Sequence, residues 1–271
     1  MLQAHHASYA IEGNTLLHDA TLECRPGEVT VLLGANGAGK TTLLRLLAGL
    51  YAASTGQVLL DGQLLSSFTS AQLAQQRAVL SQEIHLAFPL SVQDVVLMGR
   101  YPHFQRRPTR HDQHIAQQAL ADLGMSSFAE RDYSTLSGGE AQKVQMARVL
   151  AQIWEPPPQG SRVLLLDEPV SSLDIRYQHQ LLQRARQLAR QQAIVVTILH
   201  DINLAINYAD RLVLLEKGRI CATLASPFEL TEYLLQKVFA VDMRIITNPY
   251  TQKPLVVYVD GAANNGKIEP I

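Results

Sequence analysis

The residues between Gly34 and Thr42, "GANGAGKTT", have the types and the spacing of a loop that binds phosphate. They satisfy the pattern G-x-x-x-x-G-K-[ST], in which glycines let the backbone wrap closely around an anion and amides point at its oxygens. Lys40 is expected to reach the β- and γ-phosphates of a nucleotide, and the Thr41 hydroxyl to ligate Mg²⁺. The predicted nucleotide-binding residues of this phosphate loop are Asn36, Gly37, Ala38, Gly39, Lys40, Thr41 and Thr42.

The surroundings of the phosphate loop favour this interpretation over an ordinary glycine-rich turn. The loop follows "VTVLLG" (29–34), a β-branched run typical of a buried parallel strand. It precedes "TTLLRLLAGL", whose leucines recur at helical spacing. A helix that begins at such a loop adds its dipole to the attraction for an anion.

An acidic pair, Asp167 and Glu168, ends a second apolar run, "VLLLDEP". The run predicts a buried strand whose tip delivers Asp167 to the magnesium ion through water. Because side chains alternate along a strand, Glu168 is expected on the opposite side, where it polarises a water in line with the γ-phosphate. The alternative is an acidic pair that only closes a strand before a proline turn.

A second stretch with the features of an anion site, "LSGGE" (136–140), lies farther along the chain. Ser137, Gly138 and Gly139 open an amphipathic helix that is expected to run to Trp154. A helix N-terminus binds anions, and paired glycines cost helix stability unless the backbone must approach a ligand. A simple helix cap, with Glu140 in the first turn, is the alternative.

The composition excludes several classes of protein. The chain has 271 residues, of which 47% are hydrophobic and 17% charged, so a sizeable core is expected. The net charge of -1 gives no electrostatic case for binding nucleic acid. Cys24 and Cys221 are too few for a disulfide framework. The start lacks the layout of a secretory signal, and no apolar run approaches the ~18–20 residues of a membrane helix.

Short apolar runs alternate with helical patterns along most of the chain. Strands are expected within 29–34, 56–62, 162–169, 193–201 and 211–218, and mostly helices between about 91 and 154. This alternation predicts an α/β fold with a mostly parallel sheet and helices on both of its faces. We expect one domain, with a core formed by 1–90 and 160–240, a helical part at 91–159, and C-terminal strands with a tail at 241–271.

Five motifs in a fixed order identify a resemblance. The phosphate loop, "LSGGE", "LLLDEP", "SSLD" (171–174) and "LHD" (199–201) occur as in the ATP-binding subunit of ABC transporters. The chain resembles that family from about Tyr9 to Glu229. The resemblance implies a P-loop NTPase cassette with a RecA-like sheet, an N-terminal antiparallel β-subdomain and an inserted helical subdomain, and it implies hydrolysis of ATP with Mg²⁺.

The resemblance also assigns roles to single residues. Tyr9 matches the aromatic residue that stacks on adenine, although a strand tyrosine packed on the core is the alternative. Gln82 matches the glutamine that contacts Mg²⁺ and reports to the membrane partner, and His200 matches the histidine that contacts the γ-phosphate. The expected catalytic residues are Glu168, His200 and Lys40, and the expected magnesium ligands are Thr41, Gln82 and Asp167.

A second copy of the chain is the first partner that the resemblance implies. Two copies pack head to tail, so that "LSGGE" of one closes over the γ-phosphate held by the other and two ATP molecules lie at the interface. ATP binding then favours closure, and hydrolysis with phosphate release allows opening. The expected interface residues are Ser137, Gly138, Gly139 and Asp174.

The cargo and the membrane partner are indicated by resemblance alone. "VVLMGRYPH" (95–103) is similar to the segment of ATPases that serve bacterial importers of iron-siderophores, haem and cobalamin, and the expected permease-coupling residues are Gln82, Arg100, Tyr101 and Pro102. "ARVLAQIW" with the proline-bearing extension after it is most similar to the haemin importers. The implied location is the cytoplasmic face of the bacterial inner membrane, on a polytopic permease dimer served by a periplasmic substrate-binding protein.

The motif set has three other interpretations. Siderophore or cobalamin import uses the same motor and stays an alternative to haem import. A soluble ABC protein that acts on nucleic acid or ribosomes is disfavoured, because the chain has neither a long coiled-coil insertion nor two cassettes. A regulatory module that binds ATP without turnover is disfavoured by the presence of both Glu168 and His200.

Overall fold

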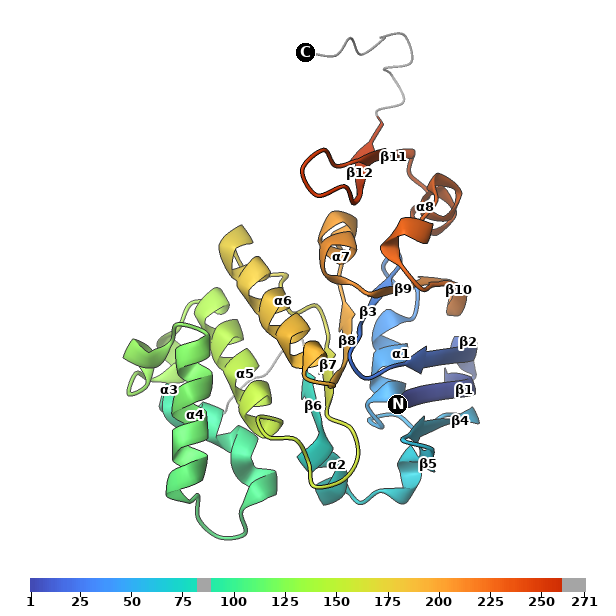
Figure 1. The fold of residues 1–271 in the computed structure, drawn as a ribbon. Helices are drawn as coiled ribbons and strands as arrows, with labels where there is room; N and C mark the ends of the chain where they lie inside the picture. The colour runs from blue at the N-terminus through green and yellow to red at the C-terminus, as the bar shows by residue number, and fades with distance from the viewer. Residues whose placement is uncertain (82–88, 260–271) are drawn as a thin grey trace.

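The computed structural model describes residues 1–81 and 89–259, and their strands form three separate sheets (Figure 1). In the central sheet every pair of neighbours is parallel except β10 and β9 at one edge. In sheet order, its strands are β10 (Arg219–Leu224), β9 (Arg211–Glu216), β3 (Val29–Leu33), β8 (Ile194–Ile198), β7 (Val163–Leu166) and β6 (Arg77–Leu80).

Two antiparallel sheets accompany the central one. The first, near the N-terminus, has the order β2 (Asn14–Cys24), β1 (Leu2–Ile11), β4 (Thr55–Leu60) and β5 (Gln63–Leu64). The second is the hairpin of β11 (Met243–Thr247) and β12 (Pro254–Tyr258), which follows the last helix. The Asn203 amide donates to the Val256 carbonyl at 3.0 Å, so the hairpin is attached to the helix that carries Asn203.

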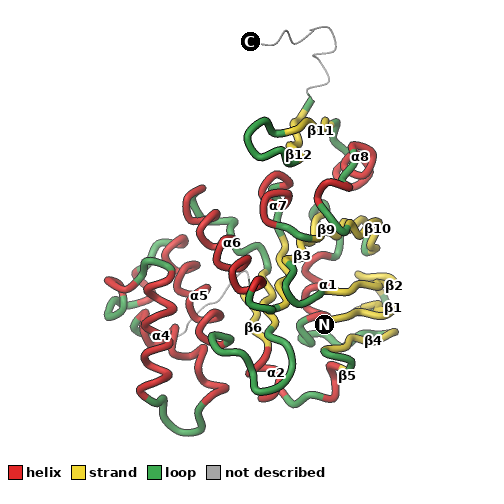
Figure 2. Tube along the Cα trace, viewed as in Figure 1, coloured by secondary structure: helices red, strands yellow, loops and turns green. Residues whose placement is uncertain are grey.

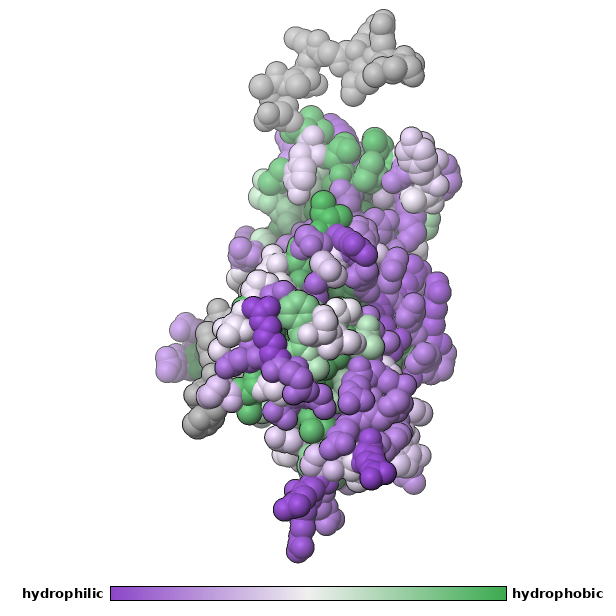
Figure 3. All heavy atoms as spheres, turned by 90° about the vertical axis from the view of Figure 1, so that its left-hand side faces the viewer, coloured by the Kyte–Doolittle hydropathy of each residue, from purple (hydrophilic) through white to green (hydrophobic). Residues whose placement is uncertain are grey.

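Helices pack around the sheets, and three of them form a helical region at one end of the molecule (Figure 2). The helices of the described residues are α1 (Lys40–Leu47), α2 (Ser70–Gln76), α3 (Val92–Leu97), α4 (Arg110–Asp122), α5 (Gly138–Gln152), α6 (Ile175–Arg190), α7 (Ile202–Tyr208) and α8 (Glu232–Phe239). The helical region consists of α3, α4 and α5, and its outward side is mostly hydrophilic with small hydrophobic areas (Figure 3). No helix within residues 1–81 and 89–259 is long and apolar enough to cross a membrane.

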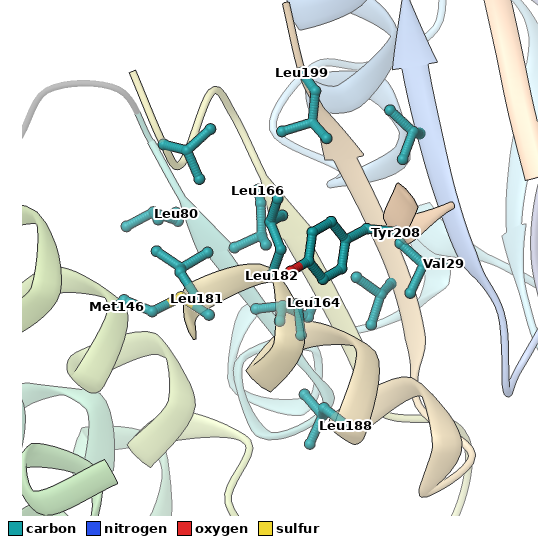
Figure 4. Close-up of a cluster of buried hydrophobic side chains, with 14 of the residues drawn as sticks. Val29, Leu80, Met146, Leu164, Leu166, Leu181, Leu182, Leu188, Leu199 and Tyr208 are labelled. Carbon is teal, nitrogen blue, oxygen red and sulfur yellow. The ribbon is translucent and has the colours of Figure 1, made fainter. Parts of the chain in front are cut away.

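The central sheet separates the core into two clusters, because alternate residues of each strand point to opposite faces. Leu164 and Leu166 of β7 pack with residues of α6 and α7, while Val163 and Leu165 pack with α1 and the N-terminal sheet. Figure 4 shows Leu164, Leu166 and Tyr208 in the first cluster. Helices therefore cover both faces, and the predicted fold class is confirmed. The elements β10, α2, α7 and α8 were not predicted from the sequence pattern.

Arg100 lies inside the helical region and not on its surface, contrary to what a direct contact with a membrane partner requires. Its side chain is 2% exposed and donates to Asp112 Oδ1 at 3.1 Å, to the Ala151 carbonyl at 2.9 Å and to Glu155 Oε2 at 3.2 Å. Burial raises the pKa of Asp112, but hydrogen bonds from Thr109 and from Arg100 outweigh it and hold that pKa below its ordinary value. Arg100 therefore connects α4 to α5 and supports the segment around it from within.

Gly99 brings the same segment into close contact with α5. A Cβ atom built on Gly99 would lie 2.1 Å from the Arg148 carbonyl oxygen, which is backbone and cannot swing away. The short 3-10 helix Met98–His103, which carries Gly99 and Arg100, is thus fixed on α5 at a distance that only glycine allows.

We predict that Asp112→Ala lowers the free energy of unfolding by roughly 3–5 kcal/mol, because it removes the buried carboxylate of the Arg100 guanidinium and leaves it only the exposed carboxylate of Glu155. The measurement is chemical denaturation at neutral pH. The control is Asp122→Ala on the same helix, whose partly exposed pair with Arg184 is expected to contribute about 1 kcal/mol or less. Because the pKa of Asp112 is lowered in the folded state, its contribution should be present above the unfolded aspartate pKa and disappear as the pH falls through the folded pKa. Equal losses for the two variants at neutral pH would contradict this assignment.

We predict that Gly99→Ala destabilises the protein by roughly 1–3 kcal/mol or more, since the helical region must shift to admit the methyl group. Gly138→Ala is the matched control for stability, because a Cβ there meets nothing within 4 Å among the residues that the structure describes. Thermal unfolding of the two variants, followed by circular dichroism, should separate them clearly. An unchanged melting temperature for Gly99→Ala would show that the two backbones are not in contact.

Candidate functional site

A cavity of about 660 Å³ lies where the phosphate loop meets the residues that follow β7 and β8. The parallel strands β3, β7 and β8 end at the same edge of the central sheet, so their following loops converge. The cavity is lined by Leu16, Asn36, Gly37, Ala38, Gly39, Lys40, Thr41, Thr42, Glu168 and His200. All seven predicted nucleotide-binding residues of the phosphate loop are therefore in its wall.

The conformation of the phosphate loop depends on its glycines. Gly39 precedes α1 with a φ of 96°, and a Cβ atom there would lie 3.1 Å from the Leu16 carbonyl oxygen. Gly37 has a φ of 76°, and a Cβ there would meet nothing within 4 Å. Gly39 is thus required by packing within the chain, whereas Gly37 borders open space in the cavity wall.

The Lys40 side chain is folded back over the phosphate loop. Its Nζ donates to the carbonyl oxygens of Gly34 at 2.8 Å and Ala35 at 3.0 Å. Burial lowers the pKa of Lys40, while the carboxylates of Glu168 and Asp167 act in the opposite direction. An ammonium group has three N–H donors, one more than these two carbonyls use. The two hydrogen bonds thus hold Lys40 at the cavity, where a positive charge suits phosphate.

Asp167 and Thr41 form a pair of oxygen groups deep in the site. Asp167 is 5% exposed, and Thr41 Oγ1 donates to its Oδ1 at 3.2 Å. Burial raises the pKa of Asp167, the charge of Glu168 raises it further, and the Thr41 hydroxyl opposes both. Carboxylate and hydroxyl oxygens are the donors that Mg²⁺ prefers, and a divalent cation would compensate a carboxylate buried here. The two side chains fit the predicted magnesium site.

Glu168 reaches its position by a route that the sequence analysis did not foresee. Strand β7 ends at Leu166, so strand alternation does not orient Glu168; instead its backbone has a φ of 50°, in the left-handed region. Its Oε1 lies 2.6 Å from Nε2 of His200, which follows β8. The Glu168 side chain is 17% exposed and that of His200 45% exposed. The carboxylate of Glu168 and the imidazole of His200 are thus paired at the cavity wall, close enough to share a proton.

The "LSGGE" residues form a helix cap that is open to solvent. Ser137 caps α5 in a reciprocal arrangement with Glu140: the Ser137 amide donates to Glu140 Oε2 at 2.8 Å, and the Glu140 amide to Ser137 Oγ at 3.4 Å. Ser137 and Gly138 are exposed, and neither is among the residues that line the cavity. The cap interpretation therefore accounts for Ser137 and Glu140, but no contact within residues 1–81 and 89–259 requires a glycine at position 138.

The other predicted site residues lie around the cavity or outside it. Tyr9 stacks on Tyr51, with ring centroids 4.5 Å apart, and does not line the cavity. Asp174 is exposed and caps α6 by accepting from the Tyr177 amide at 3.0 Å. Tyr101 is 59% exposed, and the half-buried Pro102 accepts from Gln75 at 2.8 Å. Gln82 lies outside the described residues.

Two residues near the site were missed by the sequence analysis. Leu16, in β2, lines the cavity beside Gly39 of the phosphate loop, and nothing in an apolar strand residue distinguishes it in a sequence. Gln142, in α5, donates to the backbone carbonyls of Glu168 and Pro169. Its place one helical turn after Gly138 was a readable signal, since residues four apart lie on the same side of a helix.

Comparisons with known proteins agree with this arrangement. The family model described as ABC transporter matches residues 17–171. The chain is 45% identical to the "Hemin import ATP-binding protein HmuV" of Gloeobacter violaceus (strain ATCC 29082 / PCC 7421), over 97% of this chain and 96% of the relative. It is 42% identical to the protein of the same name from Escherichia coli O157:H7, over 95% of this chain and 99% of the relative.

A solved structure extends the similarity to the fold as a whole. An ABC transporter of metal-chelate type, in an inward-facing conformation, superposes with a TM-score of 0.80 at 27% identity, covering 96% of this chain and 98% of the other. The predicted resemblance is thereby confirmed at the level of sequence and of fold. With the phosphate loop, the acidic pair and His200 assembled around one cavity, the chain belongs to the ABC transporter family.

Proposed function

We propose that the protein is the ATP-hydrolysing motor subunit of a bacterial importer and that it drives haem uptake through a partner membrane permease. The observation that carries the ATPase assignment is the convergence of Lys40, Glu168 and His200 on one cavity beside the Asp167–Thr41 pair. This is the set of groups that phosphoryl transfer needs: a positive charge, a metal site and a carboxylate for water.

Each group has a distinct task in the proposed reaction. The phosphate-loop amides and Lys40 hold the β- and γ-phosphates and stabilise the charge that develops on them. Thr41 and Asp167 hold Mg²⁺, with Gln82 as a further predicted ligand, and the bound ion supplies charge neutralisation at the phosphates. Glu168 orients or deprotonates the attacking water, and His200, already 2.6 Å from it, keeps the carboxylate in place and contacts the γ-phosphate.

The active form is proposed to be a head-to-tail dimer with two ATP molecules at its interface. Ser137 and Gly138 at the α5 N-terminus are exposed, and no contact with the described part of the chain demands a glycine at position 138. Such an end attracts a phosphate, but Ser137 and Gly138 are not in the wall of the cavity that their own chain forms. A second copy of the chain supplies the missing half of each site. Asp174 of each copy is proposed to lie near the same interface.

The remaining assembly is proposed from the family and from the exposed helical region. The permease is a polytopic dimer, and this subunit is peripheral, at the cytoplasmic face of the inner membrane; a periplasmic substrate-binding protein delivers the cargo. Tyr101, which is 59% exposed, is the proposed contact with the permease, with Pro102 beside it and Gln82 reporting the nucleotide state. Arg100 acts indirectly, by supporting this segment from inside.

Adenine is proposed to stack on Tyr9. One face of the Tyr9 ring packs against Tyr51, and Arg45 donates to the Tyr51 hydroxyl at 2.6 Å, so the ring is supported from behind. A supported aromatic ring offers its other face to a base at little cost in side-chain entropy.

Haem as cargo follows from the relatives named for hemin import. The reconstituted complex of this chain, its permease and the substrate-binding protein should hydrolyse ATP severalfold faster when the binding protein carries haem than when it is empty. Stimulation by a ferric siderophore or by cobalamin, but not by haem, would replace the cargo and keep the motor. No stimulation by any of the three would refute the importer assignment.

We predict that Glu168→Gln lowers kcat for ATP by about 10²–10⁴-fold, because the amide cannot accept a proton from water. The affinity for ATP should be retained, since the phosphate loop and Lys40 are unchanged, and a closed dimer should accumulate in saturating ATP. Phosphate release, calorimetric titration and size-exclusion chromatography measure the three effects. The control is Glu130→Gln, which changes an exposed glutamate of the helical region. This variant should hydrolyse ATP as the wild type does. Normal turnover by Glu168→Gln would refute its role.

A further inference from the structure

Gln142 joins the helix that begins at the "LSGGE" residues to the loop that carries the catalytic carboxylate. Its Nε2 donates to the Pro169 carbonyl at 2.5 Å and, more weakly, to the Glu168 carbonyl at 3.4 Å. Its Oε1 accepts from the Ser172 hydroxyl. One half-buried amide thus uses both its donor and its acceptor on the segment 168–172, which we call the catalytic loop.

The packing around Gln142 makes this connection direct. A Cβ built on Gly139 would lie 3.4 Å from the Ser172 carbonyl oxygen, so the first turn of α5 already touches the catalytic loop. The ammonium group of the neighbouring Lys143 lies 2.9 Å from the centre of the Tyr177 ring. Tyr177 belongs to α6, the helix that follows the catalytic loop. The beginning of α5 and the segment from Glu168 to Tyr177 therefore form one contact area.

The catalytic loop has a conformation that needs support. Glu168 has a φ of 50°, in the left-handed region, which is costly for a residue with a side chain and persists only when the surrounding structure holds it. A second glutamine, Gln178 of α6, donates to the carbonyls of Val170 at 3.2 Å and Leu173 at 3.0 Å. Gln178 holds the loop from the sheet core, whereas Gln142 holds it from the helical region.

We infer that Gln142 is a positioning residue that couples the two ATP sites of the dimer. In the proposed dimer, Ser137 and Gly138 contact the γ-phosphate bound by the partner. They lie one turn before Gln142 on α5. A shift of this helix end as the partner binds ATP is passed by the Gln142 amide to the backbone of Glu168, in the site of its own chain. The inference rests on the proposed function and adds the route by which occupancy at one site aligns the carboxylate at the other.

The test is the isosteric variant Gln142→Glu, assayed for ATP hydrolysis over a range of ATP concentrations. It keeps the acceptor for Ser172 but replaces the donor by a carboxylate that faces the Pro169 carbonyl. We expect kcat to fall about tenfold, the equivalent of one hydrogen bond, while ATP affinity in the Glu168→Gln background changes less than twofold. The Hill coefficient should fall from above 1 to 1, which a merely structural role would not produce.

Gln178→Glu is the matched comparison, because it makes the same change to the same loop from the other side. It should slow hydrolysis but keep the wild-type Hill coefficient. Ser172→Ala, at an exposed position, removes the second bond of Gln142 without a risk to folding and should lower the Hill coefficient in the same direction.

The outcomes separate the inference from the function it rests on. A wild-type Hill coefficient in Gln142→Glu and Ser172→Ala would overturn the inference, as would a wild type that hydrolyses ATP with a Hill coefficient of 1. Both results leave the ATPase assignment intact. Two other results would instead refute the proposed function. The wild-type protein does not hydrolyse ATP, or the Glu168→Gln variant hydrolyses it as the wild type does.

Discussion

The parallel pairing of β3, β8 and β7 is the constraint on which the site depends. Each strand ends at the same edge of the sheet, so the phosphate loop, His200 and the acidic pair meet there although they lie far apart in the sequence. Burial of both faces fixes the register, because a shift of one residue would move Leu164 and Leu166 out of their core cluster and into the other. The position of Asp167 against Thr41 is therefore set by the core of the ABC cassette, not by contacts within the site alone.

The helical region adds a second helix end that is proposed to bind an anion, the N-terminus of α5. Gly99 and Arg100 attach the segment of Tyr101 to the C-terminal half of this helix, by a backbone contact and by a hydrogen bond to the Ala151 carbonyl. Ser137 begins the same helix, and Gln142 joins it to the catalytic loop. One helix thus lies in contact with the proposed permease-facing segment, the proposed interface and the loop of Glu168. A rigid helix with three such contacts suits a motor, because a displacement at any one contact also displaces the other two.

Most of the fold and the centre of the site were predictable from the sequence. Apolar runs located β3, β7, β8 and β9, and the phosphate-loop pattern identified residues that do line the cavity. The failures have physical causes. Glu168 was assigned from strand alternation, but its orientation follows from a left-handed backbone that no local pattern reveals. Arg100 was predicted from the resemblance alone to contact the permease, and its burial depends on Asp112, a partner supplied by tertiary packing. Gln142 was missed because its bonds to the carbonyls of Glu168 and Pro169 depend on tertiary packing, although its place one helical turn after Gly138 was readable.

The central claim is that each ATP site combines the phosphate loop of one copy with the "LSGGE" residues of the other. Mixed dimers with two different tags test it directly, with phosphate release as the readout. In the first mixture one copy carries Lys40→Ala and the other Gly138→Asp; in the second, one copy carries both changes and the other is wild type. If the sites are shared, the first mixture keeps one intact site and hydrolyses ATP, and the second is inactive. If each chain forms its own site, the second mixture is active and the first is dead, and the account is contradicted.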